Sequence, residues 1–578
     1  MMDTVKSFRG YGKVDPLEEQ AFKRKTRRQI IILLVSLVVL VAIVIGVVVG
    51  TVTHQKNKKD DYVPSTSAAQ SLKAVCSVTT YPDLCYSSIS SVDNSNATAD
   101  PEKLFQLSLQ VVQDSLLKLS TLPHEWINNI HDDPLLKKAL GVCQTVFDDA
   151  IDATNESISS LNVNDGDKLL TLTKINDLKT WLSTSLTNLD TCLDSLEEIN
   201  ATIVNDVKAL MKNSTEFASN SLAIVSKLLN ILSDFKIPIH RKLLAETAGD
   251  SGFPHWVGAA DRRLLQSSSN PKPNLVVAKD GSGDFRTISA AVAKIPKKSK
   301  TRFVIYVKAG VYNEKVTLDK SLWNVMMYGD GKTQTIVTFN DNFVDGTPTF
   351  ETPTFAAAGK NFIAKNMGFK NTAGPNKHQA VAFQSGSDQS VFYQCSFNAF
   401  QDTLYAHSNR QFYRECDITG TVDFIFGNAA VIFQDCNIQP RQPLPNQFVT
   451  ITAQGKKDPN QNTGITIQNC VMAPLDKLTV PTYLGRPWKD YSTTVIMQTK
   501  IGAFLQPEGW TEWVPNIKPP STIFYAEYQN TGPGSDVTKR VKWAGYKPRL
   551  TASQASKFTV GSFIGGRDWI PASAVTYT

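Results

Sequence analysis

A repeat of about twenty residues constrains the fold of this chain more than any other feature of its sequence. Residues 391–397, 411–418 and 431–438 align with one cysteine each, and these cysteines lie 21 and 20 residues apart. Short runs rich in Val, Ile and Phe, such as residues 303–307, are typical of strands. A period near twenty with aligned apolar positions indicates a solenoid whose coils stack about 4.8 Å apart. We therefore predict an all-β right-handed parallel β-helix in the C-terminal half of the chain.

The same repeat places two aspartates at equivalent positions. Asp402 lies seven residues after Cys395, and Asp423 lies seven residues after Cys416. Equivalent positions on successive coils are neighbours, so the two carboxylates are predicted to be stacked. Two such carboxylates do not easily ionise together, and the pair can supply a proton donor and a carboxylate nucleophile. A purely structural aspartate ladder explains the spacing equally well.

The N-terminal half has a helical pattern. Leucine and valine recur at three- and four-residue steps across residues 104–116, and leucine does so across residues 182–196, which is typical of amphipathic helices. An antiparallel all-α helical bundle is the simplest arrangement for them. Because 578 residues are too many for one compact core, we predict two domains.

The two halves carry opposite charge. Residues 266–578 contain 33 Lys and Arg against 22 Asp and Glu, whereas residues 62–265 contain 16 against 25. The C-terminal part is therefore net basic and the preceding part is net acidic. This distribution suits a domain that binds a polyanion and an acidic segment that covers it.

An apolar segment near the N-terminus predicts a membrane anchor. Residues 30–52 contain no charged side chain and follow a basic run at residues 23–28, and 23 residues span a bilayer core as a helix. The more positive flank comes first, which places it in the cytoplasm. We expect a cytoplasmic basic tail at residues 1–29, a transmembrane signal anchor at 30–52 and a juxtamembrane linker at 53–69. A cleaved signal peptide is the alternative.

Glycosylation sequons and cysteines fit a chain in the secretory pathway. Four sequons precede residue 266, at Asn96, Asn155, Asn200 and Asn213, and only lumenal chains are glycosylated there. The eight cysteines can form up to four disulfides in an oxidising compartment. No Cys-x-x-Cys pair occurs and the seven histidines are scattered, so we expect no metal site and no cofactor.

Residues 75–85, which include Tyr-Pro-Asp-Leu-Cys, and the later Thr-Cys-Leu-Asp at 191–194 resemble the plant pectin methylesterase inhibitor family. The resemblance implies that Cys76 bridges Cys85 and that Cys143 bridges Cys192. We assign an inhibitor-like pro-domain to residues 70–236. A helical spacer without inhibitory activity is the alternative.

Five motifs occur in order in the C-terminal half and resemble those of pectin methylesterases. They are Gly-Val-Tyr-Asn-Glu at 310–314, Gln-Ala-Val-Ala at 379–382, Gln-Asp-Thr-Leu-Tyr at 401–405, Gly-Thr-Val-Asp-Phe-Ile-Phe-Gly at 420–427 and Leu-Gly-Arg-Pro-Trp at 484–488. The resemblance extends to Asp-Trp-Ile-Pro at 568–571 and implies a catalytic domain at residues 270–578. It also implies a pectinesterase, a carboxylic ester hydrolase that converts methyl-esterified homogalacturonan, its pectin partner, to demethylated pectin and methanol.

The resemblance also implies residue roles. Asp423 is the implied nucleophile, Asp402 the proton donor and later base, and Gln401 and Gln379 the donors to the oxyanion. Arg486 is the implied charged partner of Asp423. The implied substrate-binding residues are Thr349, Gln379, Tyr405, Phe426, Arg486 and Trp488, and the implied disulfide of this domain is Cys416–Cys436. Core packing is the alternative role for the three aromatic side chains.

Two basic-leucine sites lie in the predicted linker at residues 237–269, beginning at Arg241 and Arg262. Both resemble the processing sites of pectin methylesterase precursors, and proteases cut exposed linkers. We expect a processing protease to cut at one of them. The precursor would then stay in the membrane of the secretory pathway, and the mature enzyme would be secreted to the cell wall. We further hypothesise that the inhibitor-like domain keeps the enzyme silent until this cut.

Other classes fit the sequence less well. Polygalacturonases and pectate lyases are also β-helices, but the Asn-Thr-Asp and Gly-His-Gly signatures of the former and the calcium-binding clusters of the latter are missing. No Gly-x-Ser-x-Gly elbow of a serine esterase occurs. A mere wall-binding protein would have lost catalytic residues, and a nucleic-acid partner is not expected.

Overall fold

The computed structural model describes residues 68–92, 99–161, 171–234 and 271–578. Residues Ser67–Thr578 form one compact unit, and it contains both predicted domains. The predicted anchor at 30–52, the sequon at Asn96 and the processing sites at Arg241 and Arg262 lie outside the described residues. Within the described residues, no helix is both long enough and apolar enough to cross a bilayer.

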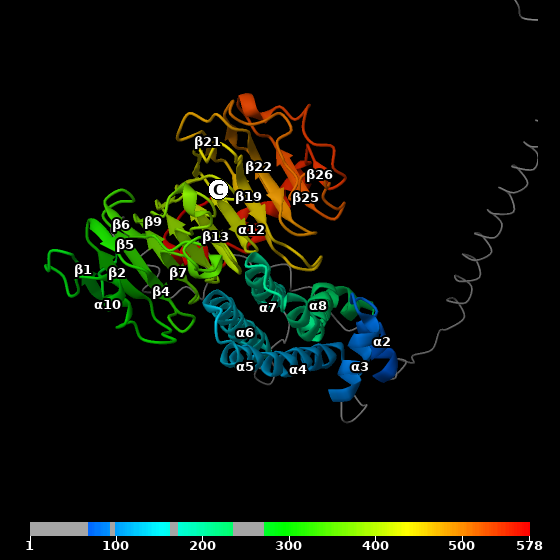
Figure 1. Ribbon diagram of the computed structural model, residues 1–578. Coiled ribbons are helices and arrows are strands. Elements are labelled where there is room, and N and C mark those ends of the chain that lie inside the picture. Colours follow the sequence, from blue (N-terminus) through cyan, green and yellow to red (C-terminus); the bar gives the residue numbers. More distant parts are fainter. Residues whose placement is uncertain (1–67, 93–98, 162–170, 235–270) are drawn as a thin grey trace, which may run out of the picture. The chain divides into compact units, whose positions relative to one another are not determined.

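The N-terminal domain is the predicted helical bundle (Figure 1). Its helices are α2 (Ala68–Cys76), α3 (Pro82–Val92), α4 (Pro101–Leu119), α5 (Leu122–Asn129), α6 (Pro134–Ser160), α7 (Leu172–Glu198) and α8 (Val204–Asp234). The long helices α4, α6, α7 and α8 pack on one another around a shared apolar core. The predicted leucine stripe of residues 182–196 is buried in that core.

Polar caps define where the long helices begin. The Asp100 side chain accepts a hydrogen bond from the Glu102 N–H at the start of α4, and a proline follows each of the caps of α4 and α6. Asp133 and Thr171 cap α6 and α7 in the same way. Such caps satisfy the backbone N–H groups that the first turn leaves unpaired.

Two disulfides tie the bundle together, as the inhibitor resemblance implied. Cys76–Cys85 joins α2 to α3, and Cys143–Cys192 joins α6 to α7. Both predictions are confirmed. The second bridge anchors α7 near its C-terminal end, the part of the helix that lines the cavity described below.

The C-terminal domain is a parallel β-helix built from three sheets (Figure 1). The eleven-stranded sheet runs in the order β1 (Leu275–Val277), β2 (Phe303–Val307), β5 (Val325–Gly329), β8 (Ile363–Lys365), β11 (Ser390–Tyr393), β14 (Arg410–Arg414), β17 (Ala430–Gln434), β20 (Gly464–Gln468), β23 (Thr493–Met497), β25 (Phe524–Tyr528) and β26 (Tyr546–Lys547). The seven-stranded sheet contains β22 (Thr482–Pro487), β19 (Val449–Gln454), β16 (Ile425–Gly427), β13 (Leu404–Ala406), β10 (Phe383–Ser385), β7 (Phe355–Ala357) and β4 (Val316–Leu318). The eight-stranded sheet contains β24 (Lys500–Ile501), β21 (Val471–Met472), β18 (Asn437–Pro440), β15 (Asp417–Gly420), β12 (Ser396–Asn398), β9 (Gly368–Asn371), β6 (Thr335–Phe339) and β3 (Gly310–Asn313).

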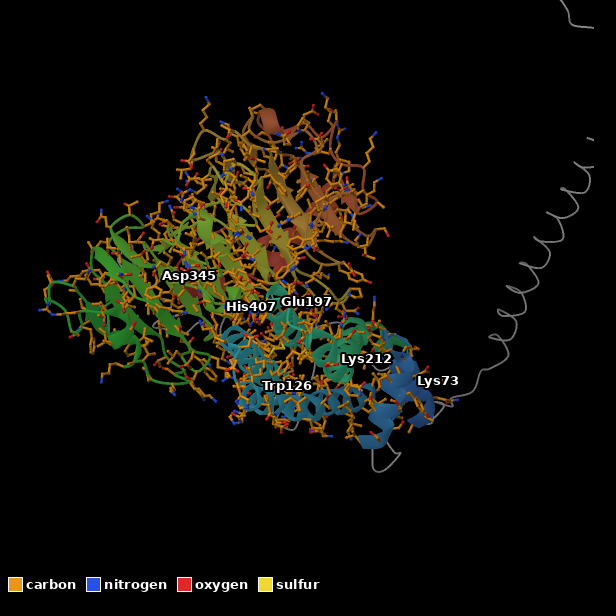
Figure 2. All side chains as sticks on the ribbon, viewed as in Figure 1. Lys73, Trp126, Glu197, Lys212, Asp345 and His407 are labelled. Carbon is orange, nitrogen blue, oxygen red and sulfur yellow. A yellow bond between two sulfur atoms is a disulfide. The ribbon has the colours of Figure 1, made fainter. Side chains whose placement is uncertain are left out.

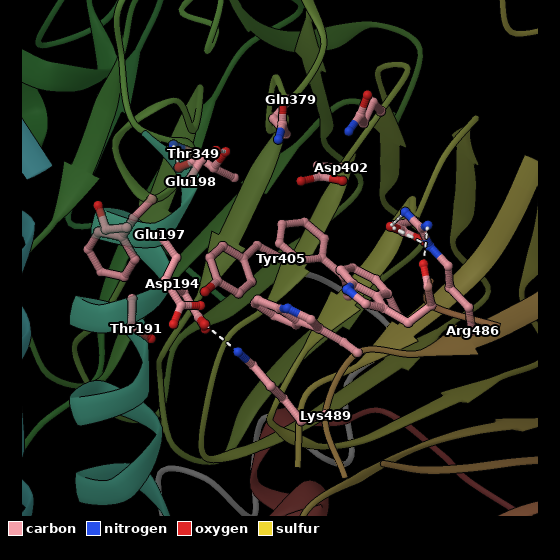
Figure 3. A pocket seen from close by; sticks show the side chains of 18 residues that line it. Thr191, Asp194, Glu197, Glu198, Thr349, Gln379, Asp402, Tyr405, Arg486 and Lys489 are labelled. Atoms are coloured by element: carbon pink, nitrogen blue, oxygen red, sulfur yellow. Dashed lines mark hydrogen bonds and ion pairs between the residues drawn. The ribbon is translucent and has the colours of Figure 1, made fainter. Parts of the chain in front are cut away.

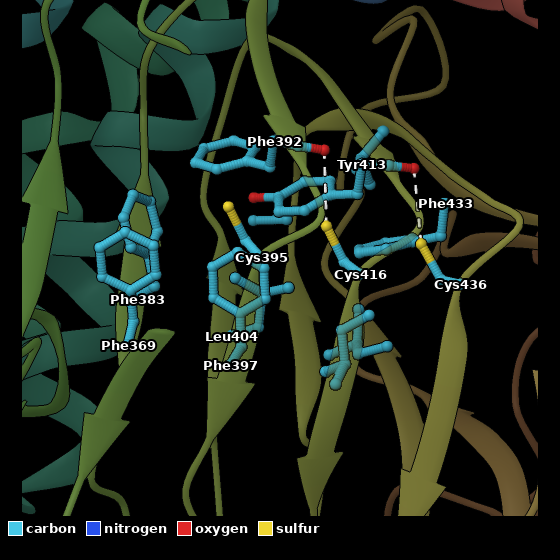
Figure 4. Close-up of a cluster of buried hydrophobic side chains, with 14 of the residues drawn as sticks. Phe369, Phe383, Phe392, Cys395, Phe397, Leu404, Tyr413, Cys416, Phe433 and Cys436 are labelled. Atoms are coloured by element: carbon cyan, nitrogen blue, oxygen red, sulfur yellow. Dashed lines mark hydrogen bonds between the residues drawn. The ribbon is translucent and has the colours of Figure 1, made fainter. Parts of the chain in front are cut away.

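The strand register confirms the repeat that the sequence predicts. Val391 pairs with Phe412, which pairs with Ile432, so successive coils are offset by the same 21 and 20 residues as the cysteines. Inside the coils, aromatic rings stack along the axis (Figure 4). The ring centroids of Phe392 and Tyr413 lie 4.4 Å apart, and those of Tyr413 and Phe433 lie 4.7 Å apart. Such offset stacks add to the stabilisation from burial.

The cysteines of the β-helix differ from the prediction. Cys395, Cys416, Cys436 and Cys470 are buried free thiols, so the Cys416–Cys436 disulfide is wrong for this structure. Each thiol donates to a backbone carbonyl on the preceding coil, as for Cys416 to Phe392 at 3.4 Å and Cys436 to Tyr413 at 3.5 Å (Figure 4). The thiols therefore contact the backbone of the preceding coil, and they also lie within hydrogen-bond reach of the thiols on neighbouring coils without forming a disulfide.

The outer faces of the sheets are covered differently. The C-terminal segment with α11 (Ala552–Ala555) and α12 (Val560–Phe563) packs on the eleven-stranded sheet, where Trp569 and Ile570 join an apolar cluster with Ile432. The short helix α10 (Ile288–Val292) lies at the first coils, beside β1 and β4. The outer face of the seven-stranded sheet carries the cavity described next.

Candidate active site

The two predicted aspartates occupy equivalent places on adjacent coils. Asp402 precedes β13 and Asp423 precedes β16, and Leu404 pairs with Ile425. The Asp402 N–H donates to the carbonyl of Val422 at 3.0 Å. Both aspartates adopt left-handed backbone angles, with φ of 60° and 50°, which Asp tolerates better than most residues. The predicted stacking is therefore confirmed, and both side chains are buried.

Asp423 is held by two side chains from the next two coils. The Arg486 guanidinium on β22 donates from Nε to both carboxylate oxygens at 3.0 and 3.1 Å, and from Nη2 to Oδ2 at 2.6 Å. The Thr450 hydroxyl on β19 donates to Oδ1 at 2.6 Å and accepts the Asp423 N–H at 2.8 Å. Charge-assisted hydrogen bonds of this kind are short and strong, and they fix the orientation of the Asp423 carboxyl group.

Asp402 has the opposite electrostatic environment. Burial raises the pKa of Asp402 well above its usual range, the charges of Asp423 and Glu198 raise it further, and Arg486 opposes them. Asp402 therefore holds a proton at pH values where an exposed aspartate is ionised. Asp402, with its raised pKa, and Asp423, held by Arg486 and Thr450, therefore lie one coil apart in different environments.

Two glutamine side chains flank the aspartates. Gln379 and Gln401 form a parallel backbone bridge on adjacent coils, and both line the cavity that contains Asp402 and Asp423. Figure 3 shows Gln379 and Asp402 on the same side of this cavity. Their amides are neutral hydrogen-bond donors, which suits an oxyanion.

Aromatic rings form another part of the cavity wall, and the cavity has a volume of about 380 Å³. Tyr405 stacks on Phe426 with centroids 4.2 Å apart, and Trp488 stacks on Trp513 at 6.2 Å. The Arg486 guanidinium lies 4.2 Å from the Trp513 ring centroid. The three aromatic residues predicted from the motifs are thus brought together with the aspartates.

Several functional side chains were missed by sequence reasoning. Thr450 is equivalent to Asp423 on the next coil, since Ile425 pairs with Thr452. That coil is 27 residues long because of a loop after β18, so the twenty-residue period does not reveal that Thr450 is equivalent to Asp423. Trp513 lies in a loop with no matching repeat. No sequence signal points to the lysine at 489, which also lines the cavity.

The helical domain contributes the remaining wall of the cavity. Asp194, Ser195, Glu197 and Glu198, near the C-terminal end of α7, line it together with the β-helix residues (Figure 3). The predicted substrate-binding residue Thr349 donates from its N–H to the Glu198 carboxylate at 3.2 Å and from its hydroxyl to the same group. A residue predicted to bind substrate thus binds the N-terminal domain.

Burial changes the titration of the helical side chains at this wall. It raises the pKa of Glu198 to about 7 and that of Asp194 to about 6, where the Lys489 ammonium opposes the rise. Burial also lowers the pKa of His407 to about 3. His407 lies on the β-helix (Figure 2). Its Nε2 is 2.9 Å from the Thr191 hydroxyl of α7.

Helix α7 contacts the β-helix along its whole length. Near its N-terminal end Asp177 pairs with Arg410 at 2.7 Å, and Arg410 also pairs with Asp388 at 2.6 Å. In its middle, the Thr184 hydroxyl donates to Asn409 at 2.8 Å. The contact therefore extends from one end of α7 to the cavity.

Three of the predicted glycosylation sites lie among the described residues of the helical domain. Asn200 and Asn213 are exposed, whereas Asn155 is half-buried and accepts a hydrogen bond from Gln113.

In the described part of the chain, no group of three or more His, Cys, Asp or Glu side chains is arranged to hold a metal ion.

Comparison with known proteins matches each domain to a family. Residues 274–567 match the family described as pectinesterase, and residues 70–224 match the plant invertase/pectin methylesterase inhibitor family. The chain is 59% identical to pectinesterase 3 of Phaseolus vulgaris over 100% of this chain and 99% of that protein. It is 56% identical to pectinesterase 1 of Arabidopsis thaliana over 99% of both.

A solved structure of a pectin methylesterase from carrot is 50% identical, with a TM-score of 0.51, and covers 54% of this chain and 99% of that chain. Fold and site together define a β-helical carboxylic ester hydrolase with an added helical domain. The chain belongs to the pectinesterase family, with an N-terminal domain of the plant invertase/pectin methylesterase inhibitor family.

Proposed function

We propose that the C-terminal domain hydrolyses the methyl esters of homogalacturonan by an aspartyl mechanism, with Asp423 as nucleophile and Asp402 as proton donor. The observation that carries the proposal is the pairing of two carboxyl groups a single coil apart: Asp423 is fixed by hydrogen bonds from Arg486 and Thr450, and Asp402 is buried with a raised pKa. Arg486 and Thr450 hold the first through hydrogen bonds of 2.6–3.1 Å. Burial keeps the pKa of the second high.

In the first half of the reaction, Asp423 attacks the ester carbonyl carbon and a C–O bond forms. The carbonyl electron pair moves to oxygen, and the Gln379 and Gln401 amides donate to this oxyanion, each worth about 3 kcal/mol. The electron pair then returns, the bond to the methoxy group breaks, and Asp402 gives its proton to the leaving group. Methanol leaves, and the galacturonoyl group remains as an anhydride with Asp423.

In the second half, the ionised Asp402 accepts a proton from water as the water oxygen attacks the galacturonoyl carbon. The bond to Asp423 breaks and restores its carboxylate, while Asp402 is protonated again. The sum is one ester and one water converted to a uronic acid and methanol. Trp488, Trp513 and Tyr405 offer apolar faces for the sugar rings.

We also propose that the N-terminal domain is an autoinhibitor. This idea is supported by the contacts of α7, which line the cavity of the proposed catalytic residues and bind Thr349. Cleavage at Arg241 or Arg262 would release the catalytic domain from the inhibitor-like domain. In this proposal the precursor is glycosylated and anchored in the membrane by residues 30–52, and the mature enzyme is secreted to the cell wall. The β-helix has its own apolar core, separate from that of the bundle. The matching carrot chain corresponds to 54% of this one, which supports independent folding of residues 266–578.

The test is methanol release from highly methylated pectin, with polymer length monitored. Residues 266–578 should release methanol without shortening the polymer, and Asp423→Asn should abolish release. Shortened chains would indicate a glycosidase or a lyase instead. Residues 53–578 with Arg241→Gln and Arg262→Gln should be nearly inactive, and full activity of this uncut chain would refute autoinhibition.

A further inference from the structure

A row of carboxylates on one face of α7 points at the β-helix. Asp190, Asp194 and Glu198 are four residues apart, so they share a face of the helix with about 6 Å between successive positions along its axis. The row ends in the catalytic cavity, where Glu198 and Asp194 belong to its wall.

Each of these carboxylates has its own partner on the β-helix. The Lys457 ammonium lies 2.8 Å from Asp190, Lys489 pairs with Asp194 (Figure 3), and Thr349 donates to Glu198. Three carboxyl groups at regular spacing along α7 therefore each meet one hydrogen-bond donor of the β-helix.

The two lysines belong to one structural feature. Lys457 follows β19 and Lys489 follows β22, which are adjacent strands paired from Val449 and Thr482 to Gln454 and Pro487. Lys489 also lies 5.1 Å from the centroid of the Trp488 ring. Without α7, the two ammonium groups would extend from the cavity edge along the end of the seven-stranded sheet.

A carboxylate row with regular spacing is also what demethylated pectin presents. Every hydrolysed ester leaves one more carboxylate on the polymer, and the β-helix domain is net basic. Lysines that pair with the α7 carboxylates have the charge and the position to pair with uronate carboxylates that extend out of the cavity.

We propose that Lys489 and Lys457 bind the unesterified uronates adjacent to the methyl ester under attack, and that α7 imitates this anionic stretch of polymer. The proposal rests on the esterase function proposed above. It makes demethylation faster beside residues that are already demethylated, because each product carboxylate becomes a binding group for the next turnover.

The experiment uses residues 266–578 with Lys457→Gln, Lys489→Gln and the double variant. An exposed lysine on the eight-stranded sheet supplies the matched control, Lys500→Gln. The probes are an unesterified oligogalacturonate and the same oligomer fully methylated, with binding followed by tryptophan fluorescence. Each substitution should weaken binding of the unesterified oligomer about five-fold, as expected for a partly exposed ion pair, and Lys500→Gln should not.

The ratio of kcat/KM on half-demethylated pectin to that on highly methylated pectin should fall by the same factor in each lysine variant. Lys489→Arg and Lys457→Arg keep the charge and should restore the ratio, which separates charge loss from misfolding. Equal binding of the unesterified oligomer by the wild type and the double variant would overturn the proposal. An equal loss for both oligomers would overturn it too. A wild type that binds the oligomer but releases no methanol would instead refute the esterase function.

Discussion

The charge of Glu198 gives a sharp test of autoinhibition. In the covered cavity, burial raises the pKa of Glu198 from 4.5 to about 7, the Thr349 hydrogen bonds oppose the rise, and the charge of Asp194 adds to it. When the helical domain separates from the β-helix, the Glu198 carboxyl returns to water and to its ordinary pKa. We call this the open state. The covered state therefore binds the proton of Glu198 more tightly than the open state does.

The sign of the pH dependence follows. A carboxyl whose pKa is raised in the covered state stabilises that state fully below pH 4.5, and the stabilisation is lost as the pH rises through about 7. The rise from 4.5 to about 7 corresponds to about 3 kcal/mol. Asp194, with its pKa raised to about 6, acts in the same direction. His407, with its pKa lowered to about 3, favours the covered state at higher pH.

The perturbation is Glu198→Gln in residues 53–578 with both processing sites blocked by Arg241→Gln and Arg262→Gln. Glutamine has the shape of the protonated acid and never ionises, so the variant should equal the wild type at pH 4.5. At pH 8 its residual methanol release should be at least about ten-fold lower than that of the wild type. The contributions of Asp194 and His407 are present in both proteins and cancel in the ratio.

The control is Glu125→Gln, an exposed glutamate on α5 of the same domain, which should leave the ratio unchanged at both pH values. Each rate is divided by that of residues 266–578 at the same pH, so the enzyme's own pH profile is removed. If Glu198→Gln and the wild type are inhibited equally at pH 8, burial of this charge does not oppose closure, and the reasoning is wrong.

Three further predictions follow from the site and the fold. Thr450→Val in residues 266–578 removes a hydrogen bond to an ionised group, worth about 1.5–3 kcal/mol, and should lower kcat/KM for methanol release about 10- to 100-fold. Thr450→Ser keeps the hydroxyl and should retain activity. Thr466→Val should retain it too, because the buried Thr466 hydroxyl has no partner among the described residues. Full activity of Thr450→Val would exclude a role for the Thr450 hydrogen bond to Asp423. Arg486→Lys keeps the charge but loses the two-pronged contact with Asp423, so kcat should fall at least about ten-fold, and a kcat within two-fold of wild type in the same assay would contradict this. Replacing Cys143 and Cys192 by serine opens a loop with a sequence separation of 49, and it should destabilise the helical domain by about 4 kcal/mol in urea unfolding. Replacing Cys76 and Cys85, which close a shorter loop, should cost about 3 kcal/mol. A larger loss for the shorter loop would refute the loop-length argument.

The parts of the fold that repeat were the parts that the sequence predicted. The cysteine spacings of 21 and 20 residues reappear as the strand offsets at Val391, Phe412 and Ile432, because coils of nearly equal length stack in register. The stacking of Asp402 and Asp423 follows from the same regularity. The two disulfides of the bundle came from the family resemblance.

Other features were not predictable because they depend on irregular coils or on contacts between domains. The 27-residue coil before Thr452 hides the equivalence of Thr450 and Asp423. The free thiols of Cys416 and Cys436 depend on side-chain direction, which spacing does not reveal. The contact between Glu198 and Thr349 joins residues 151 positions apart, and no local pattern records it.

Five of the proposed chemical groups lie on successive coils, and this limits how such a protein can change in length. Gln379, Asp402, Asp423, Thr450 and Arg486 lie at β10, β13, β16, β19 and β22, which are consecutive neighbours in one sheet. An extra coil inserted between any two of these strands would separate their groups by about 4.8 Å more, well beyond hydrogen-bond reach. Insertions are therefore tolerated in the loops that leave a coil, or beyond the first and last of these five strands, but not as whole coils between them.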